Sequence, residues 1–166
     1  MAQSTIVLVH GAFAESASWQ GVITRLQAAG HPTIAAGNPL RSLAGDAASV
    51  RSVLASVEGP VVLVGHSYGG AVASGAVQGN PAVRALVFVA AFAPAEGESI
   101  AELSGRYPGS TLGETIQPVP LADGSTDLYI RQDLFHQQFA ADLPAEQAAV
   151  AAVTQRPLRD ARSTRR

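Results

Sequence analysis

The stretch from Val61 to Gly70 reads VVLVGHSYGG. Its first half is a short apolar run rich in β-branched residues, as in strands that are buried on both faces of a parallel sheet. Its second half opens a helix of small residues, and Gly65 and Gly69 flank Ser67 by two positions. Glycines at that spacing permit the sharp strand-to-helix turn that exposes a serine hydroxyl above the strand end. The pattern predicts a nucleophile at Ser67, and the alternative is a tight turn with a capping serine.

Strand and helix patterns alternate around this stretch. Apolar runs predict strands at 5–9, 32–36, 60–64 and 84–90, and apolar residues at helical spacing predict helices at 19–29, 43–57 and 68–78. Such alternation is typical of an α/β fold, here with a parallel sheet of about four strands and flanking helices.

The rhythm changes after residue 93. The pattern predicts a short helix at 100–106, two short strands around the turn Asp123-Gly124, and helices at 131–140 and 144–154. No further buried-strand run follows, so this region is interpreted as a cap-like α/β insertion over the sheet. We therefore divide the chain into a core at 1–93, a cap at 94–157 and an arginine-rich tail at 158–166.

Composition excludes several classes of protein. The chain is 47% hydrophobic and 14% charged, so it can bury a core, and its net charge is −2. Five of its 11 basic residues crowd into the last 11 positions, which indicates a solvated tail rather than a nucleic-acid arm. Cysteine is absent, and neither metal-ligand spacing nor a phosphate-binding loop is found. We expect no metal, no cofactor, no nucleic-acid partner, no membrane span, and a soluble cytoplasmic protein.

A second motif, LVHGAFAESASW, runs from Leu8 to Trp19. Acyl transfer needs N–H donors aimed at the carbonyl oxygen as it becomes an oxyanion, one after the nucleophile and one in the loop after a neighbouring strand. The backbone amides of Tyr68 and Phe13 occupy those places. Gly11 lets the backbone approach closely, and His10 is expected to hold the loop by a hydrogen bond.

The segments VLVHGAFAESASW, LQAAGHP, VVLVGHSYGG and ALVFVAAFAP together resemble the α/β-hydrolase superfamily, in particular its small members similar to plant methylesterases, hydroxynitrile lyases and bacterial esterases. The resemblance covers residues 5–157. It implies a nucleophile at Ser67, oxyanion donors at the Phe13 and Tyr68 amides, and a cap that shapes a pocket for a small ester or carbonyl substrate. His10, Gly11, Ala12 and His66 would then be loop and pocket residues around the nucleophile.

The resemblance also places a triad acid and histidine on loops after later core strands. This sequence has no such strands, so we expect a chain truncated after the cap. Serine needs an adjacent base, and only four histidines are present. His10, His31 and His66 are interpreted as structural, which leaves His136 in the cap as a possible base.

Two hypotheses for function stay open. One is a serine hydrolase that forms an acyl-enzyme on Ser67, with lyase chemistry on the same elbow as a variant. The other is an inactive remnant that binds small apolar ligands or a partner chain. Without outer neighbours, the strand predicted at 84–90 would be an exposed apolar edge, so we expect a homodimer through it, partial disorder or poor solubility.

Overall fold

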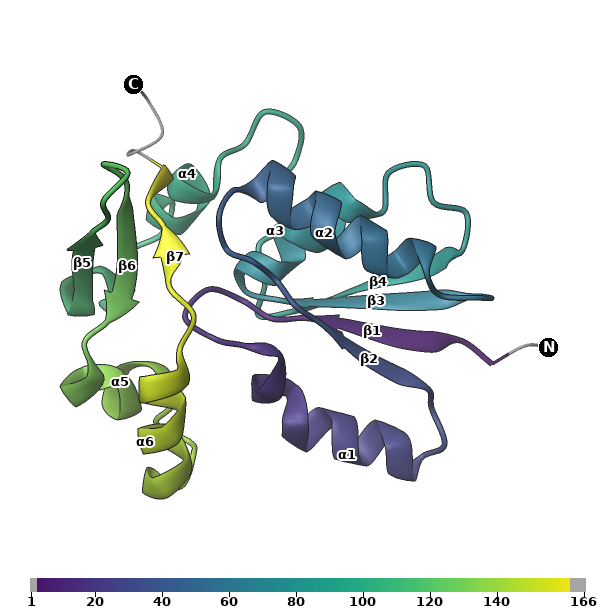
Figure 1. The fold of residues 1–166 in the computed structure, drawn as a ribbon, viewed down its shortest axis with the longest axis horizontal. Helices are drawn as coiled ribbons and strands as arrows, with labels where there is room; N and C mark the ends of the chain where they lie inside the picture. The colour runs from purple at the N-terminus through teal and green to yellow at the C-terminus, as the bar shows by residue number, and fades with distance from the viewer. Residues whose placement is uncertain (1–2, 162–166) are drawn as a thin grey trace.

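The computed structural model describes residues 3–161. Its centre is a parallel sheet in the order β2-β1-β3-β4 (Figure 1). The four strands are β1 Thr5–Val9, β2 Thr33–Ala36, β3 Val61–His66 and β4 Val83–Val89. The α/β prediction is confirmed, and each strand lies within two residues of its predicted place. Near-continuous apolar runs suit β1 and β3, which lie between helices on both faces of the sheet, whereas the apolar run of β4 is largely exposed.

Helices lie on both sides of the sheet in Figure 1, with α1 on one face and α2 and α3 on the other. Their bounds, with the 3-10 turn η1 that precedes them, are η1 Ser16–Trp19, α1 Gln20–Ala28, α2 Leu43–Ala55 and α3 Tyr68–Ala76. Within residues 3–161, none of the helices has the length and apolar content needed to cross a bilayer.

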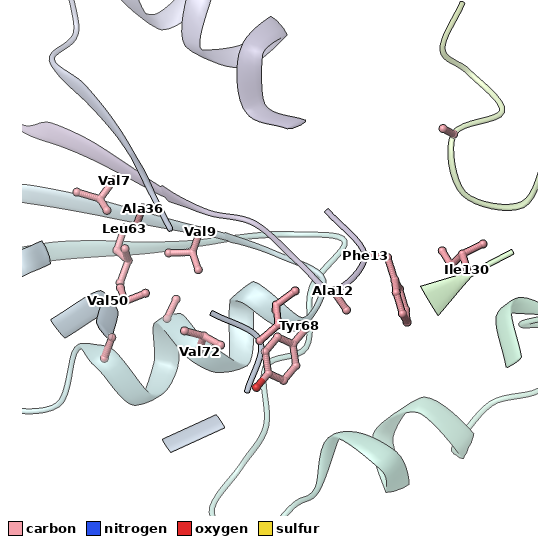
Figure 2. Close-up of a cluster of buried hydrophobic side chains, with 14 of the residues drawn as sticks. Val7, Val9, Ala12, Phe13, Ala36, Val50, Leu63, Tyr68, Val72 and Ile130 are labelled. Atoms are coloured by element: carbon pink, nitrogen blue, oxygen red, sulfur yellow. The ribbon is translucent and has the colours of Figure 1, made fainter. Parts of the chain in front are cut away.

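The main core fills the layer between the sheet and α2 and α3. Val7, Val9 and Leu63 of the strands are fully buried there against Val50 and Val72 of the helices (Figure 2). Alternate side chains of a strand point to opposite faces, so the intervening residues pack on α1 in a second, smaller cluster. This packing fixes the carboxyl ends of β1 and β3 side by side.

The second half of the chain forms a smaller antiparallel sheet with helices around it (Figure 1). From here on, the name cap denotes residues 100–161, which include a strand from the expected tail. Its elements are α4 Ile100–Gly105, η2 Leu112–Thr115, β5 Ile116–Pro120, β6 Thr126–Ile130, α5 Gln132–Phe139, α6 Ala145–Thr154 and β7 Leu158–Arg159. The hairpin predicted around Asp123-Gly124 is present. Gly124 takes a positive φ of 79° there, a conformation that glycine adopts without strain.

The short strand β7 corrects one expectation. Leu158 and Arg159 were assigned to a solvated tail, but they pair with β6 and are half-buried. The Arg159 N–H donates to the carbonyl of Leu40, and its guanidinium donates to Asp123 at 3.0 Å. Two residues carry no periodicity, so these partners from distant sequence determine the strand. Residues 162–166 of the expected tail lie outside the described part of the chain.

One edge of the central sheet is apolar. β4 pairs with β3 and ends the sheet, and its residues Val87, Phe88 and Val89 are each 41–42% exposed. Exposed backbone groups beside apolar side chains offer a template for another strand. The homodimer expected through this edge stays a prediction.

Candidate active site

Ser67 occupies a strained turn between β3 and α3. Its backbone has φ 53° and ψ −125°, a region that non-glycine residues occupy at a cost of about 1–3 kcal/mol. The flanking glycines are sterically required. A Cβ on Gly65 would lie 2.6 Å from the carbonyl oxygen of Gly69, and a Cβ on Gly69 would lie 2.7 Å from that of His10. The two glycines therefore allow β1, β3 and α3 to meet closely enough to make the turn.

Backbone hydrogen bonds from the end of β4 hold the turn. The carbonyl of Ser67 accepts from the N–H of Phe92 at 3.0 Å, and the N–H of Ser67 donates to the carbonyl of Val89 at 3.4 Å. The side chain of Ser67 does not cap α3. Its hydroxyl is therefore not used by the helix, unlike that of a capping serine.

The loop after β1 lies directly against Ser67. A Cβ on Gly11 would come within 2.8 Å of the Ser67 Cβ and 3.3 Å of its Oγ, so only glycine permits this approach. Ala12 and Phe13 follow, both buried, and Phe13 has a positive φ of 59°. Tyr68 begins α3, where N–H groups lack helical partners and favour negative charge. The oxyanion role of the Phe13 and Tyr68 amides stays a prediction.

His10 holds the loop and has no free ring nitrogen. The N–H of Asn38 donates to its Nε2 at 3.1 Å, so the proton sits on Nδ1, which donates to the carbonyl of Gly11 at 2.9 Å. The side-chain amide of Asn38 also donates to the backbone carbonyl of His10. Burial lowers the pKa of His10, which keeps the ring neutral. The contacts are those expected of a residue that joins the loops after β1 and β2.

The rings of the other three histidines are exposed or contact groups other than Ser67. The His66 ring packs edge-on against Trp19 at 6.2 Å between centroids, and burial lowers its pKa. His31 is exposed at the junction of α1 and β2. In the cap, His136 is exposed, and its Nε2 lies 3.0 Å from the carbonyl oxygen of Leu143. Among residues 3–161, no hydrogen bond joins the Ser67 hydroxyl to any of the four.

One buried polar pair beside the turn escaped the sequence analysis. The Tyr68 hydroxyl donates to Asp46 Oδ2 at 2.8 Å, and Asp46 is fully buried. Burial and the neighbouring carboxylate raise the pKa of Tyr68 well above its usual range. A signal was available, because Asp46 stands on the apolar face of α2, three residues after Leu43 and four before Val50. A charged residue on such a face needs a buried partner.

We compared the sequence with models of known protein families. The result agrees with the strand order and with the strained turn at Ser67. The pattern of the Alpha/beta hydrolase family matches residues 6–166. The chain belongs to this family.

Among curated relatives of this α/β-hydrolase, a carbendazim hydrolyzing esterase of Nocardioides sp. is 34% identical over 60% of this chain and 47% of its own. A pyrethroid hydrolase of Sphingobium wenxiniae is 29% identical over 88% of this chain and 58% of its own. The chain thus spans about half the length of the curated relatives that it matches.

Solved structures extend the comparison. A pyrethroid hydrolase from Sphingobium faniae superposes with a TM-score of 0.71 at 26% identity, covering 87% of this chain and 64% of its own. Polyneuridine aldehyde esterase superposes with a TM-score of 0.79 at 20% identity, covering 95% and 70%. At that identity the likeness concerns the fold alone. The described residues therefore form part of the α/β-hydrolase fold.

Proposed function

We propose that this chain is a serine-nucleophile hydrolase of small carboxylic esters, with Ser67 as the nucleophile. The observation that carries the proposal is the strained backbone of Ser67, at φ 53° and ψ −125°, with Gly11 packed against its side chain. Strain of this kind persists only where the surroundings impose it, and it clusters at active sites. The turn agrees with the nucleophile elbow of α/β-hydrolases.

The proposed reaction is acyl transfer. The Oγ of Ser67 bonds to the carbonyl carbon, its proton passes to a base, and the carbonyl oxygen becomes an oxyanion. The Phe13 and Tyr68 amides donate to that oxygen. When the carbonyl re-forms, the ester C–O bond breaks, the alcohol leaves with a proton, and an acyl-enzyme remains on Ser67 for water to hydrolyse.

The substrate class rests on the relatives and on the character of the cap. The esterase and the pyrethroid hydrolase among the relatives carry the names of small organic substrates. On the cap side, Ile130, Phe135 and Phe139 pack in the same apolar cluster as Phe13. Apolar walls near the nucleophile suit an apolar acyl or alcohol group. We propose that the cap forms one wall of the substrate pocket.

The lack of a base bonded to Ser67 in the described residues limits the rate of ester hydrolysis. No histidine of the described residues is bonded to Ser67, and His136 is engaged with Leu143. Loss of the triad base in a serine hydrolase lowers kcat by roughly 10⁶-fold, and the oxyanion hole retains about 10³–10⁴-fold over water. We therefore propose that the chain reacts with strong acylating or phosphonylating agents at Ser67 but turns over esters slowly.

One observation favours the second candidate function, a binding protein without turnover. β4 exposes Val87, Phe88 and Val89 at the sheet edge, which suits a partner chain or a second copy. A second subunit bound there could also supply a base. Absence of both labelling and turnover above the Ser67→Ala background would favour the binding protein, whereas labelling at Ser67 supports the hydrolase.

The test is fluorophosphonate labelling followed by intact mass, with p-nitrophenyl acetate turnover measured in parallel. Ser67→Ala should abolish labelling, whereas His136→Ala and its control His31→Ala should both label at the wild-type rate. Equal labelling of wild type and Ser67→Ala would refute the proposed nucleophile. Loss of labelling in His136→Ala alone would make His136 the base and overturn the proposed slow turnover.

A further inference from the structure

Two sets of contacts run from the cap to the loops that carry the proposed oxyanion donors. One reaches Tyr68 through Arg41 and Asp46, and the other reaches Phe13 through Phe139. Neither set involves Ser67 directly. Each begins on an element of the cap and ends on a residue whose backbone amide is proposed to bind the oxyanion.

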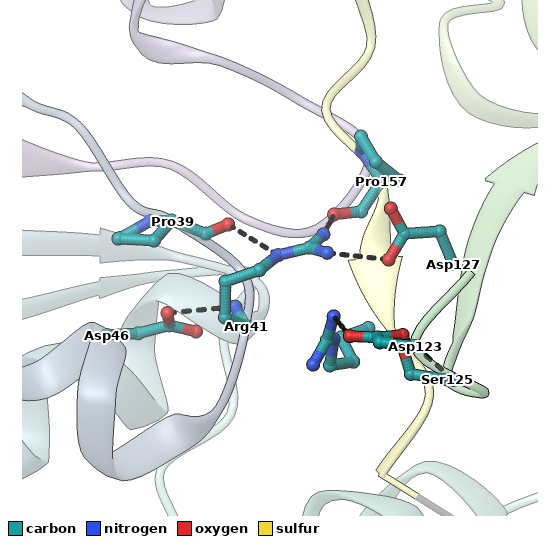
Figure 3. A network of polar contacts seen from close by, with 8 residues as sticks. Pro39, Arg41, Asp46, Asp123, Ser125, Asp127 and Pro157 are labelled. Carbon is teal, nitrogen blue, oxygen red and sulfur yellow. Dashed lines mark hydrogen bonds and ion pairs between the residues drawn. The ribbon is translucent and has the colours of Figure 1, made fainter. Parts of the chain in front are cut away.

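Arg41 makes the first connection to the cap. It lies between β2 and α2, and its guanidinium donates to Asp127 of β6 at 2.6 Å and to the carbonyl of Pro157 at 2.6 Å (Figure 3). Its Nε donates to the carbonyl of Pro39. Asp127 is buried, so this charged pair is shielded from water and salt on one side. The planar guanidinium therefore fixes the loop after β2 against the cap sheet.

The same residue reaches Tyr68 through a buried carboxylate. The backbone N–H of Arg41 donates to Asp46 Oδ1 at 3.0 Å, and Tyr68 donates its hydroxyl to Oδ2 at 2.8 Å. Asp46 has no exposed surface, so water cannot replace either donor without rearrangement. An unpaired buried acceptor is costly, and the two donors therefore move together with the carboxylate. A shift of Arg41 is transmitted to the residue that follows Ser67.

Phe139 of α5 makes the second connection. Its ring meets Phe13 edge-on at 6.2 Å between centroids, and Phe135 packs against its other side at 5.1 Å. Phe13 has a positive φ, a strained conformation for a residue with a side chain, and it depends on neighbours to keep it. The aromatic contact from the cap is one such neighbour.

We propose that the cap is a positioning element for the oxyanion hole, with Arg41, Asp46 and Phe139 as positioning residues for its two amides. This inference rests on the proposed function, because it concerns the same N–H groups. Donors must lie about 2.7–3.1 Å from the developing oxyanion, and a misplacement of about 1 Å can cost roughly 100-fold in rate. The seating of the cap thus sets the reactivity of Ser67, in addition to shaping the pocket.

The test uses variants that cut each connection. Arg41→Met removes the guanidinium but leaves Asp127 buried without its partner, so the double variant Arg41→Met/Asp127→Leu is made beside it. Replacing both members of a buried pair by apolar residues is often neutral for stability. Phe139→Ala cuts the aromatic contact. The matched controls are Asp133→Asn, which cuts the exposed Arg131–Asp133 pair of the cap, and Val150→Ala, at a site 61% exposed on α6.

We expect fluorophosphonate labelling of Ser67 to slow by about tenfold or more in the double variant and in Phe139→Ala, with both controls within about twofold of wild type. Where turnover is measurable, kcat should fall and KM should stay. Wild-type labelling rates in the folded variants would overturn the proposal. A rise in KM alone would also overturn it, because the cap would then be only a pocket wall.

Hydrogen exchange separates this inference from the proposed function. The double variant should speed amide exchange in residues 66–72, and Phe139→Ala should speed it in residues 11–15. If wild type does not label at all, the proposed function fails, and exchange alone decides the coupling. Exchange that changes only within the cap would then refute it.

Discussion

Gly65→Ala should destabilise the fold by acting on the turn at Ser67. A Cβ at this position would lie 2.6 Å from both the Gly69 oxygen and the Gly70 Cα, and 2.7 Å from the Gly70 nitrogen. All three are backbone atoms, so no flexible side chain can move aside. Overpacking of this kind costs typically about 1–3 kcal/mol, and three backbone overlaps favour the upper end. A loss of about 3 kcal/mol corresponds to roughly 6–12 °C in Tm for a chain of this size.

The assay is urea unfolding followed by tryptophan fluorescence, since the chain has one tryptophan, Trp19, which is buried. The matched control is Gly37→Ala, where a Cβ would meet nothing within 4 Å and φ is not positive. That variant should be neutral or gain up to about 1 kcal/mol, because alanine restricts the unfolded chain. Equal stability of Gly65→Ala and wild type would refute the steric account of the motif.

Three further predictions concern separate features. Tyr68→Phe should lose about 1–3 kcal/mol of unfolding free energy in thermal or urea melts, because it leaves the buried Oδ2 of Asp46 without its donor. An unchanged melt contradicts this. Burial lowers the pKa of His66 in the folded chain, so below about pH 6.5 the unfolded chain binds more protons and the protein loses stability as the pH is lowered. His66→Phe should flatten this dependence in urea midpoints measured from pH 7.5 to 5. An unchanged slope counts against it. Val87→Lys should convert the proposed dimer to monomer in light scattering, whereas Val150→Lys should not; a wild-type monomer refutes the edge pairing.

The central sheet could be predicted because its signals are local. The run Val61–Val64 is apolar throughout and its counterparts nearly so, and the helices repeat their apolar residues at 3.6-residue spacing. The signal for the turn at Ser67 is also local, since the glycines that permit the turn stand two residues away on either side. Strong local patterns of this kind survive tertiary packing.

The features that the sequence did not reveal depend on distant partners. Arg41 looks like an isolated surface charge, and its contacts to Asp127 and Pro157 come from residues more than 80 positions away. β7 is too short to carry a pattern. Leu40 and Phe13 have a positive φ although they are not glycines, so their residue types do not predict this conformation. In each case the surrounding fold imposes a conformation that the local sequence does not favour.

The bond from the Phe92 N–H to the Ser67 carbonyl bears on the order in which the protein matures. The turn at Ser67 gains this bond only after the chain through Phe92 has been synthesised and β4 has paired with β3. We therefore expect the strained backbone of Ser67 to become stable only after the chain through Phe92 has left the ribosome. Under the proposed function, the nucleophile is therefore assembled only once residue 92 has been made and the four strands of the central sheet are in place.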